Sequence, residues 1–169
     1  MGIRLALGAL VLSASAALAA DMIKAGDPFP EWKLRDQNGV VVSSKDMAGK
    51  TYLLWYYPRA MTPGCTAEGD GLRDNFPGFK ERGVEILGVS FDEPTDNARF
   101  VEMEHFPFRL LTDGDRKLAV AVGAAGDTTM PMARRISYLV GPDGRVLKVY
   151  ATVNPGTHAT DVLTDVATR

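Results

Sequence analysis

The segment TYLLWYYPRAMTPGC, residues 51–65, constrains the fold more than any other stretch of the chain. It joins a β-rich run to a helix start and ends at the one cysteine of the sequence, Cys65. Pro58 ends the predicted strand, Thr62 suits a helix N-cap, and Pro63 suits the first helical position, where no N–H is needed. Cys65 is thereby placed in the first helical turn, where unpaired backbone N–H groups and the helix dipole stabilise a thiolate.

Two interpretations of Cys65 follow from this position. In the first, it is an activated sulfur presented at the end of a strand. In the second, it is a buried structural cysteine, since free cysteines are commonly buried and inert. Because the sequence has no second cysteine, no intramolecular disulfide can form, and the fold must depend on its core.

Residues 1–19 differ in character from the rest of the chain. A short basic start is followed by an apolar, small-residue run from Leu5 to Leu18, and Ala17-Leu18-Ala19 fits a signal-peptidase site. The run is short and poor in large apolar residues for a membrane anchor. We therefore predict a cleaved secretory signal peptide, a mature domain over residues 20–169 without a transmembrane segment, and a periplasmic or secreted location.

The composition excludes several classes of function. A net charge of −2 gives no reason to expect a nucleic acid or an anionic membrane surface as a partner. The two histidines, His105 and His158, are far apart and show no metal-ligand spacing, so each is predicted to be hydrogen-bonded or solvent-exposed. Gly123 and Gly126 do not form a phosphate-binding loop. We expect neither a metal nor a cofactor.

The pattern of β-rich and helical segments predicts a βαβαβα order followed by a hairpin and a last helix. Strands are expected at residues 32–34, 40–43, 51–57, 84–90, 109–112, 135–140 and 146–152. Helical segments are expected at residues 44–47, 65–75, 79–82, 95–105, 117–122 and 160–167. Within the helix at 95–105, Phe100, Val101 and Met103 are expected to face inward. This order indicates an α/β protein with a central mixed sheet and helices on both faces.

The motif Thr62-Pro63-Gly64-Cys65-Thr66, preceded by Tyr57-Pro58 and followed by Glu68, resembles the active-site signature of the peroxiredoxins. The likeness is greatest to the bacterioferritin-comigratory (Q-type) branch and covers roughly residues 26–149. It also includes the segments Gly49-Lys50, Gly88-Val89-Ser90, 108–113 and 135–140. The resemblance implies a thioredoxin-like fold and a thiol-dependent peroxidase that reduces hydrogen peroxide, with organic hydroperoxides as further candidate substrates.

The resemblance also implies roles for individual residues. Cys65 would attack the O–O bond as a thiolate and become a sulfenic acid, with the Thr62 hydroxyl directed at the sulfur and at a peroxide oxygen. Pro58 would shield the pocket from water. Arg135 matches the family's fixed cation, which favours the thiolate and stabilises charge on the leaving oxygen. Strand alternation turns its neighbour Arg134 to the other face. Without the cysteine loop, the residues alone favour the interpretation of Arg135 as a solvent-facing strand charge.

Glu68 lies one turn beyond Cys65 on the same helical face. The resemblance implies that it orients Arg135, whereas the residues alone fit a solvated helix carboxylate as well. Many Q-type members carry a second cysteine five residues after the first, where this chain has Asp70. The chain therefore resembles a one-cysteine peroxiredoxin, whose sulfenic acid needs an external thiol, either a small molecule or a thioredoxin-like protein. A monomer or weak homodimer is expected.

Other functional classes fit the chain less well. One is a thiol sensor, or a binding or chaperone-like protein, built on a thioredoxin fold and working without turnover. The set of Pro58, Thr62 and Arg135 favours the enzyme, because a sensor needs no groups that stabilise a transition state. A disulfide oxidoreductase is disfavoured, because the sequence has no Cys-x-x-Cys motif.

Overall fold

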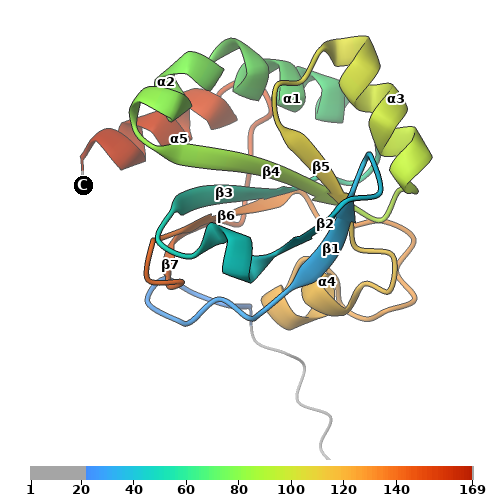
Figure 1. Ribbon diagram of the computed structural model, residues 1–169, viewed down its shortest axis with the longest axis horizontal. Helices are drawn as coiled ribbons and strands as arrows, with labels where there is room; N and C mark the ends of the chain where they lie inside the picture. The colour runs from blue at the N-terminus through green and yellow to red at the C-terminus, as the bar shows by residue number, and fades with distance from the viewer. Residues whose placement is uncertain (1–21, 169) are drawn as a thin grey trace, which may run out of the picture.

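The computed structural model describes residues 22–168, whose strands form one seven-stranded sheet in the order β2-β1-β5-β4-β3-β6-β7 (Figure 1). The strands are β1 (Lys33–Asp36), β2 (Val41–Ser43), β3 (Thr51–Tyr56), β4 (Val84–Ser90), β5 (Arg109–Thr112), β6 (Ile136–Val140) and β7 (Val146–Tyr150). The helices are the 3-10 helix η1 (Ser44–Met47), α1 (Pro63–Asp74), α2 (Phe76–Glu81), α3 (Pro94–Glu104), α4 (Lys117–Val122) and α5 (His158–Ala167). The predicted signal peptide, residues 1–19, lies outside the described residues.

The sheet is mixed, as the order of the elements predicts. Strand β3 runs parallel to β4, and β4 runs parallel to β5. Strand β6 is antiparallel to both β3 and β7, and β1 is antiparallel to both β2 and β5. The helical crossovers after β3 and β4 return the chain to the same end of the sheet, which is why these neighbouring strands are parallel.

Helices cover both faces of the sheet, and β3 lies between the two layers (Figure 1). On one face, Leu53 and Trp55 of β3 belong to a core shared with helices α1, α2, α3 and α5. On the other face, Leu54 and Tyr56 belong to a core shared with α4 and η1. Residues 52–57 are all buried, because a central strand covered on both faces has no solvent-facing side. The predicted α/β layering is confirmed.

The interior face of α3 differs from the prediction at one residue. Phe100 is buried and Val101 is half-buried, but Met103 is exposed, so its inward placement was wrong. The buried polar residue Asn97 sets the orientation, because Asn97 and Phe100 lie three residues apart on the same helical face. Met103 lies about a third of a turn from the centre of that face.

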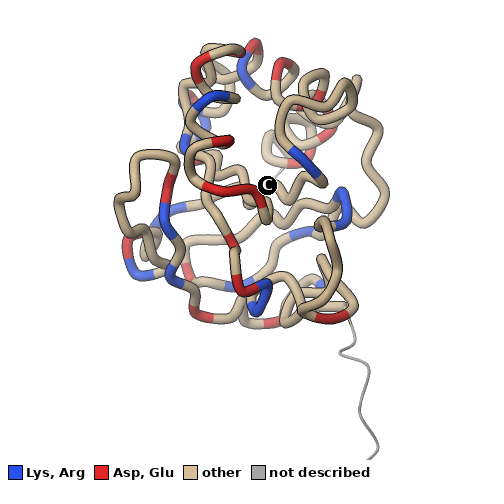
Figure 2. Tube along the Cα trace, turned by 90° about the vertical axis from the view of Figure 1, so that its right-hand side faces the viewer, with Lys and Arg blue, Asp and Glu red and all other residues tan. Residues whose placement is uncertain are grey.

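Charged residues of both signs are distributed along the chain. In the view of Figure 2, Lys and Arg are interspersed with Asp and Glu along the trace, in keeping with the net charge of −2. Within residues 22–168, no helix combines the length and the apolar character needed to cross a membrane.

Close packing explains one of the two glycines in the middle of α1. A Cβ at Gly69 would lie 2.4 Å from Cζ of Phe106 and 3.1 Å from Cη2 of Trp55. Phe106 is itself held by stacking on Phe108, so it cannot easily move aside. A Cβ at Gly71 would meet only ordinary contacts, at 3.8 Å or more. Gly69 therefore lets α1 approach the sheet, while Gly71 leaves room for a methyl group.

We expect Gly69→Ala and Gly71→Ala to change the free energy of unfolding in opposite directions. The gain in helix propensity is worth up to about 1 kcal/mol at either position. At Gly69, overpacking should outweigh it and destabilise the protein by about 1–3 kcal/mol. Urea denaturation of both variants measures the difference. Equal stabilisation by the two substitutions would contradict the packing argument.

Candidate active site

Cys65 occupies the position predicted from the sequence. Thr62 is the N-cap of α1, Pro63 is its first residue, and Cys65 is its third. The loop between β3 and α1 is held by the connection that follows β4, because the backbone N–H of Ala60 donates to Asp92 Oδ2 at 2.8 Å. Within this loop Met61 adopts a left-handed conformation, with φ of 59°, which is uncommon for a residue other than glycine. The sulfur therefore sits in the first turn of a helix that begins directly after β3.

Arg135 reaches the sulfur from a distant part of the chain. It lies one residue before β6, and its Nη2 is 3.5 Å from Cys65 Sγ. Its Nη1 donates to the carbonyl oxygen of Gly64 at 3.4 Å and forms an ion pair with Glu68 Oε2. Only 21% of the Arg135 side chain is exposed, so the solvent-facing interpretation was wrong. Arg134 is turned elsewhere, since its Nη1 donates to the carbonyl oxygen of Gly123.

The absence of a side chain at Gly64 permits this approach. A Cβ there would lie 3.0 Å from Nη2 of Arg135, which is closer than most side chains tolerate. The residue before the cysteine is thus small because the guanidinium passes over its backbone. The Thr-Pro-Gly-Cys sequence combines a helix start with the space for a cation.

Glu68 is fully buried and is not the solvated carboxylate that the residues alone allowed. Burial raises the pKa of the Glu68 carboxyl, while the hydrogen bond from Arg135 and the nearby indole N–H of Trp55 act in the opposite direction. Trp55 Nε1 faces the carboxyl, yet within residues 22–168 neither this atom nor Glu68 Oε1 has a hydrogen bond of normal geometry. Glu68 thus holds the guanidinium through one oxygen and leaves the other without a full partner.

Thr62 and Pro58 flank the sulfur along the sequence, and both are half-buried. The Thr62 hydroxyl donates to the carbonyl oxygen of Arg59 at 2.9 Å, which turns its proton away from Cys65. Pro58 follows Tyr57 directly, and the Tyr57 hydroxyl is anchored on Asn97 Oδ1 at 2.6 Å. The structure places Cys65, Arg135 and Glu68 in contact, and it places Thr62 and Pro58 in the adjoining loop.

Residues that were not predicted as site residues lie behind the ion pair. His158, in the first turn of α5, is buried, and its Nε2 lies 2.9 Å from Ser137 Oγ and 3.8 Å from Glu68 Oε1. Burial lowers the pKa of His158 to about 4, and the Arg135 charge adds to this effect while Asp161 opposes it. The hydrogen-bonded state predicted for His158 is confirmed, but its place beside Glu68 had no sequence signal. Ser137 could have been inferred, because it is two residues from Arg135 on the same face of one strand.

Cys65 itself is fully buried. The interpretation of Cys65 as a buried structural cysteine was therefore right about its burial. The contact with a guanidinium, however, is the electropositive setting that reactive cysteines need, and a packing role does not require it. No group of three or more His, Cys, Asp or Glu side chains in the described part of the chain is arranged to hold a metal ion.

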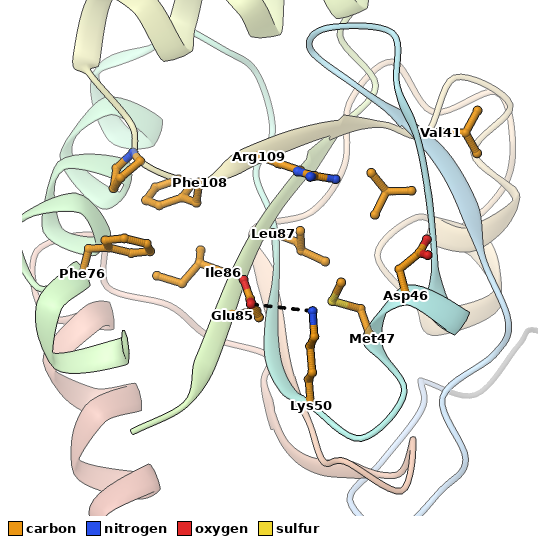
Figure 3. A pocket seen from close by; sticks show the side chains of 12 residues that line it. Val41, Asp46, Met47, Lys50, Phe76, Glu85, Ile86, Leu87, Phe108 and Arg109 are labelled. Carbon is orange, nitrogen blue, oxygen red and sulfur yellow. Dashed lines mark ion pairs between the residues drawn. The ribbon is translucent and has the colours of Figure 1, made fainter. Parts of the chain in front are cut away.

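A cavity of about 380 Å³ lies elsewhere on the molecule (Figure 3). It is lined by the first residues of β4 and β5 together with parts of β2, η1 and α2, and the Lys50–Glu85 ion pair crosses it at 3.8 Å. Cys65 follows the opposite end of β3, which is parallel to β4. This cavity therefore belongs to the far end of the sheet and is separate from the sulfur.

A mixed α/β sheet that presents a cysteine in a helix start beside a half-buried guanidinium defines a thiol protein of thioredoxin-like class. The family model described as the AhpC/TSA family matches residues 25–149. The chain belongs to this family, and within it to the peroxiredoxins of the bacterioferritin-comigratory (Q-type) branch, here with a single cysteine. It is accordingly a thiol-dependent peroxidase by family.

Three relatives illustrate the match. Peroxiredoxin Bcp of Escherichia coli strain K12 is 39% identical over 146 residues, which cover 83% of this chain and 94% of that protein. The crystal structure of peroxidoxin BcpB from Mycobacterium tuberculosis superposes with a TM-score of 0.78 at 28% identity, covering 86% of this chain and 97% of that one.

The third relative is the bacterioferritin comigratory protein of Xanthomonas campestris, with a TM-score of 0.77 at 27% identity. The match covers 88% of this chain and 98% of that one. Its structures are described as trapped intermediate and ligand complexes that bear on alkyl peroxide reduction. The predicted thioredoxin-like fold is confirmed by these structures.

The ion pair suggests a stability test. Arg135→Met leaves a buried carboxylate at Glu68 without its cation, which we expect to destabilise the protein by about 3–5 kcal/mol. Adding Glu68→Gln removes that charge and should recover much of the loss, because the two side chains are directly coupled. Urea denaturation at pH 7 measures Arg135→Met, Glu68→Gln and the double variant. If the double variant is as unstable as the sum of the single ones, the pair contributes through packing alone.

His158 suggests a pH test. Its pKa in the folded protein is about 4, below the ordinary 6.5. Between these two pH values the unfolded chain therefore binds a proton on His158 that the native protein does not bind. The stabilisation from this group is present above about pH 6.5 and is lost as the pH falls towards 4, to a limit of about 3 kcal/mol. Glu68 acts in the opposite direction, since its raised pKa favours the native state at acid pH.

We therefore expect His158→Phe to flatten the acid decline of the unfolding free energy between pH 6.5 and 4 relative to the unmodified protein. His105→Asn is the matched control, because His105 is exposed and its left-handed backbone suits asparagine. Denaturant titrations across this range measure all three proteins. An unchanged slope in His158→Phe would mean that another group causes the decline.

Proposed function

We propose that the protein reduces hydrogen peroxide and organic hydroperoxides through a sulfenic acid at Cys65, which an external thiol then reduces. The observation that carries the proposal is the 3.5 Å contact between Arg135 Nη2 and Cys65 Sγ at a helix start. Organic hydroperoxides are included because the Xanthomonas campestris relative is described in terms of alkyl peroxide reduction.

The first step is a displacement on oxygen. The Cys65 thiolate attacks one peroxide oxygen, an S–O bond forms as the O–O bond breaks, and the departing oxygen takes a proton to leave as water or an alcohol. Arg135 favours the ionised sulfur before the attack and stabilises negative charge on the departing oxygen during it. Glu68 keeps the guanidinium in place. The sulfur is oxidised by two electrons, and the peroxide is reduced by two.

Thr62 and Pro58 complete the proposed site. The Thr62 hydroxyl donates to the carbonyl oxygen of Arg59, so it must rotate to donate to a peroxide oxygen. Rotation about one side-chain bond suffices, because hydroxyl-bearing side chains interconvert between staggered rotamers. Pro58 limits the access of water to the sulfur from the loop side.

Regeneration needs two external thiols. The first condenses with the sulfenic acid and releases water, which gives a mixed disulfide, and the second displaces Cys65 as a thiol. Asp70 stands where a resolving cysteine would be, and it is engaged with Arg73 Nη1 at 2.6 Å. The thiol comes from a small molecule or from a thioredoxin-like protein. We further propose an exported enzyme that acts as a monomer or weak dimer, after cleavage close to Ala20.

The test is stopped-flow oxidation of the purified mature protein by hydrogen peroxide and by cumene hydroperoxide. We expect a rate constant far above that of a free thiol, a product heavier by one oxygen atom, and no reaction in Cys65→Ser. Arg135→Met should lower the rate by at least about a hundredfold, because it removes the fixed charge beside the reacting oxygen. A bulk-thiol rate in the unmodified protein would reject the peroxidase mechanism.

A further inference from the structure

Four polar side chains behind Cys65 form a row of contacts that runs from Arg135 through Glu68 and His158 to Ser137. Arg135 is paired with Glu68, Glu68 Oε1 lies 3.8 Å from His158 Nε2, and that nitrogen lies 2.9 Å from Ser137 Oγ. Ser137 and Arg135 are neighbours on one face of the same segment. Three elements thereby meet at Glu68: helix α1, helix α5 and the start of β6. Glu68 and Ser137 are fully buried, and His158 is 2% exposed.

The second oxygen of Glu68 needs a donor. Glu68 Oε1 is buried and has no hydrogen-bond partner within residues 22–168. An ionised carboxylate oxygen in an apolar interior is costly unless an N–H group points at it. Two such groups lie close by, the indole Nε1 of Trp55 and the imidazole Nε2 of His158.

The surroundings of His158 select one tautomer. Its Nε2 faces two oxygen atoms, Ser137 Oγ and Glu68 Oε1. A lone pair on Nε2 would face the carboxylate oxygen and be repelled by it, whereas a proton on Nε2 is attracted to both oxygens. His158 is neutral near pH 7, because burial and the nearby Arg135 disfavour its cation. The single ring proton therefore belongs on Nε2.

We propose that His158 is a positioning residue for Arg135. Its Nε2–H, anchored on Ser137, fixes the Glu68 carboxylate, and the carboxylate in turn fixes the guanidinium over Cys65. The proposal rests on the function proposed above for the sulfur and extends it to a residue of α5. His158 does not touch Cys65 or the peroxide, so it acts only through Glu68.

The placement of α5 suits this role. His158 is the first residue of α5, and its ring packs edge-on against Tyr150 of β7, with ring centres 5.3 Å apart. Helix α5 also packs along α1, the helix that carries both Cys65 and Glu68. The imidazole is therefore held from two sides while its Nε2 edge faces Glu68. A displacement of α5 would therefore move the guanidinium of Arg135 relative to the Cys65 sulfur, through the side chains of His158 and Glu68.

A matched pair of substitutions tests the proposal. His158→Gln keeps an N–H donor close to the position of Nε2. His158→Met introduces a side chain of nearly the same shape as glutamine but without a donor. Thr164→Ala, on the exposed side of α5, is the control. We expect His158→Met to slow the oxidation of Cys65 by hydrogen peroxide about tenfold, since the N–H group beside the buried Glu68 carboxylate is lost. His158→Gln should stay within about threefold of the unmodified rate, as the retained donor predicts.

Two further measurements separate positioning from a structural role. The midpoint of the pH–rate profile for Cys65 oxidation should move to higher pH in His158→Met and not in His158→Gln. Nitrogen-15 chemical shifts of the histidine ring in the unmodified protein should show the proton on Nε2. Neither signal depends on the overall stability of the fold. Equal rates in His158→Met and the unmodified protein, equal losses in both variants, or a proton on Nδ1 would each overturn the proposal.

The test also distinguishes the two proposals from each other. A slow reaction of the unmodified protein with peroxide rejects the peroxidase mechanism alone. In that case the rate of Cys65 alkylation by iodoacetamide decides the role of His158, because alkylation depends on the thiolate that Arg135 stabilises. A slower reaction in His158→Met than in His158→Gln supports positioning, and equal rates overturn it. If His158→Met fails to fold, the tautomer of the unmodified protein decides.

Discussion

The partly buried ion pair between Glu68 and Arg135 is the interaction on which the site depends. Arg135 comes from a segment next to β6 and Glu68 from the second turn of α1, and they meet directly over the turn that carries Cys65. Without Glu68, the guanidinium would be better solvated in water than beside the sulfur, and the Arg135 side chain would turn to solvent. Burial of such a pair carries a desolvation cost that only good geometry and further hydrogen bonds offset. The carbonyl oxygen of Gly64 supplies one of these bonds.

The fold supplies what this pair requires. Helix α1 can lie close to the sheet because Gly69 has no side chain to meet Phe106, and Arg135 can cross the backbone because Gly64 has none either. The central strand β3 is buried on both faces, so its end is a rigid point from which the loop before α1 departs. The loop is also hydrogen-bonded to Asp92, in the connection that follows the neighbouring strand β4. The sulfur is thus positioned by rigid elements on both sides of a short loop.

Much of the architecture could be predicted from sequence patterns because those patterns act locally. The strand bounds at 84–90 and 109–112 and the helix at 117–122 agree with the structure. Disagreement appears where a buried polar group sets the orientation of a helix. Met103 was expected to face inward from α3, but the burial of Asn97 sets the orientation of that helix and leaves Met103 exposed. A buried asparagine cannot be recognised from a hydrophobic pattern, because its side chain is polar.

The sequence by itself determined where Cys65 stands, since a threonine at the N-cap position and a proline at the first helical position define a helix start through backbone preferences of adjacent residues. The resemblance to a known family pointed to Arg135, but the residues alone left Arg135 and Glu68 open as solvated charges. Only the tertiary structure decided that the two are paired, that Cys65 is buried beside them, and that His158 stands behind Glu68. The physical reason is that these contacts join residues far apart in the chain. Their distances depend on the order of the strands and on the packing of α5 against α1, which no local pattern contains.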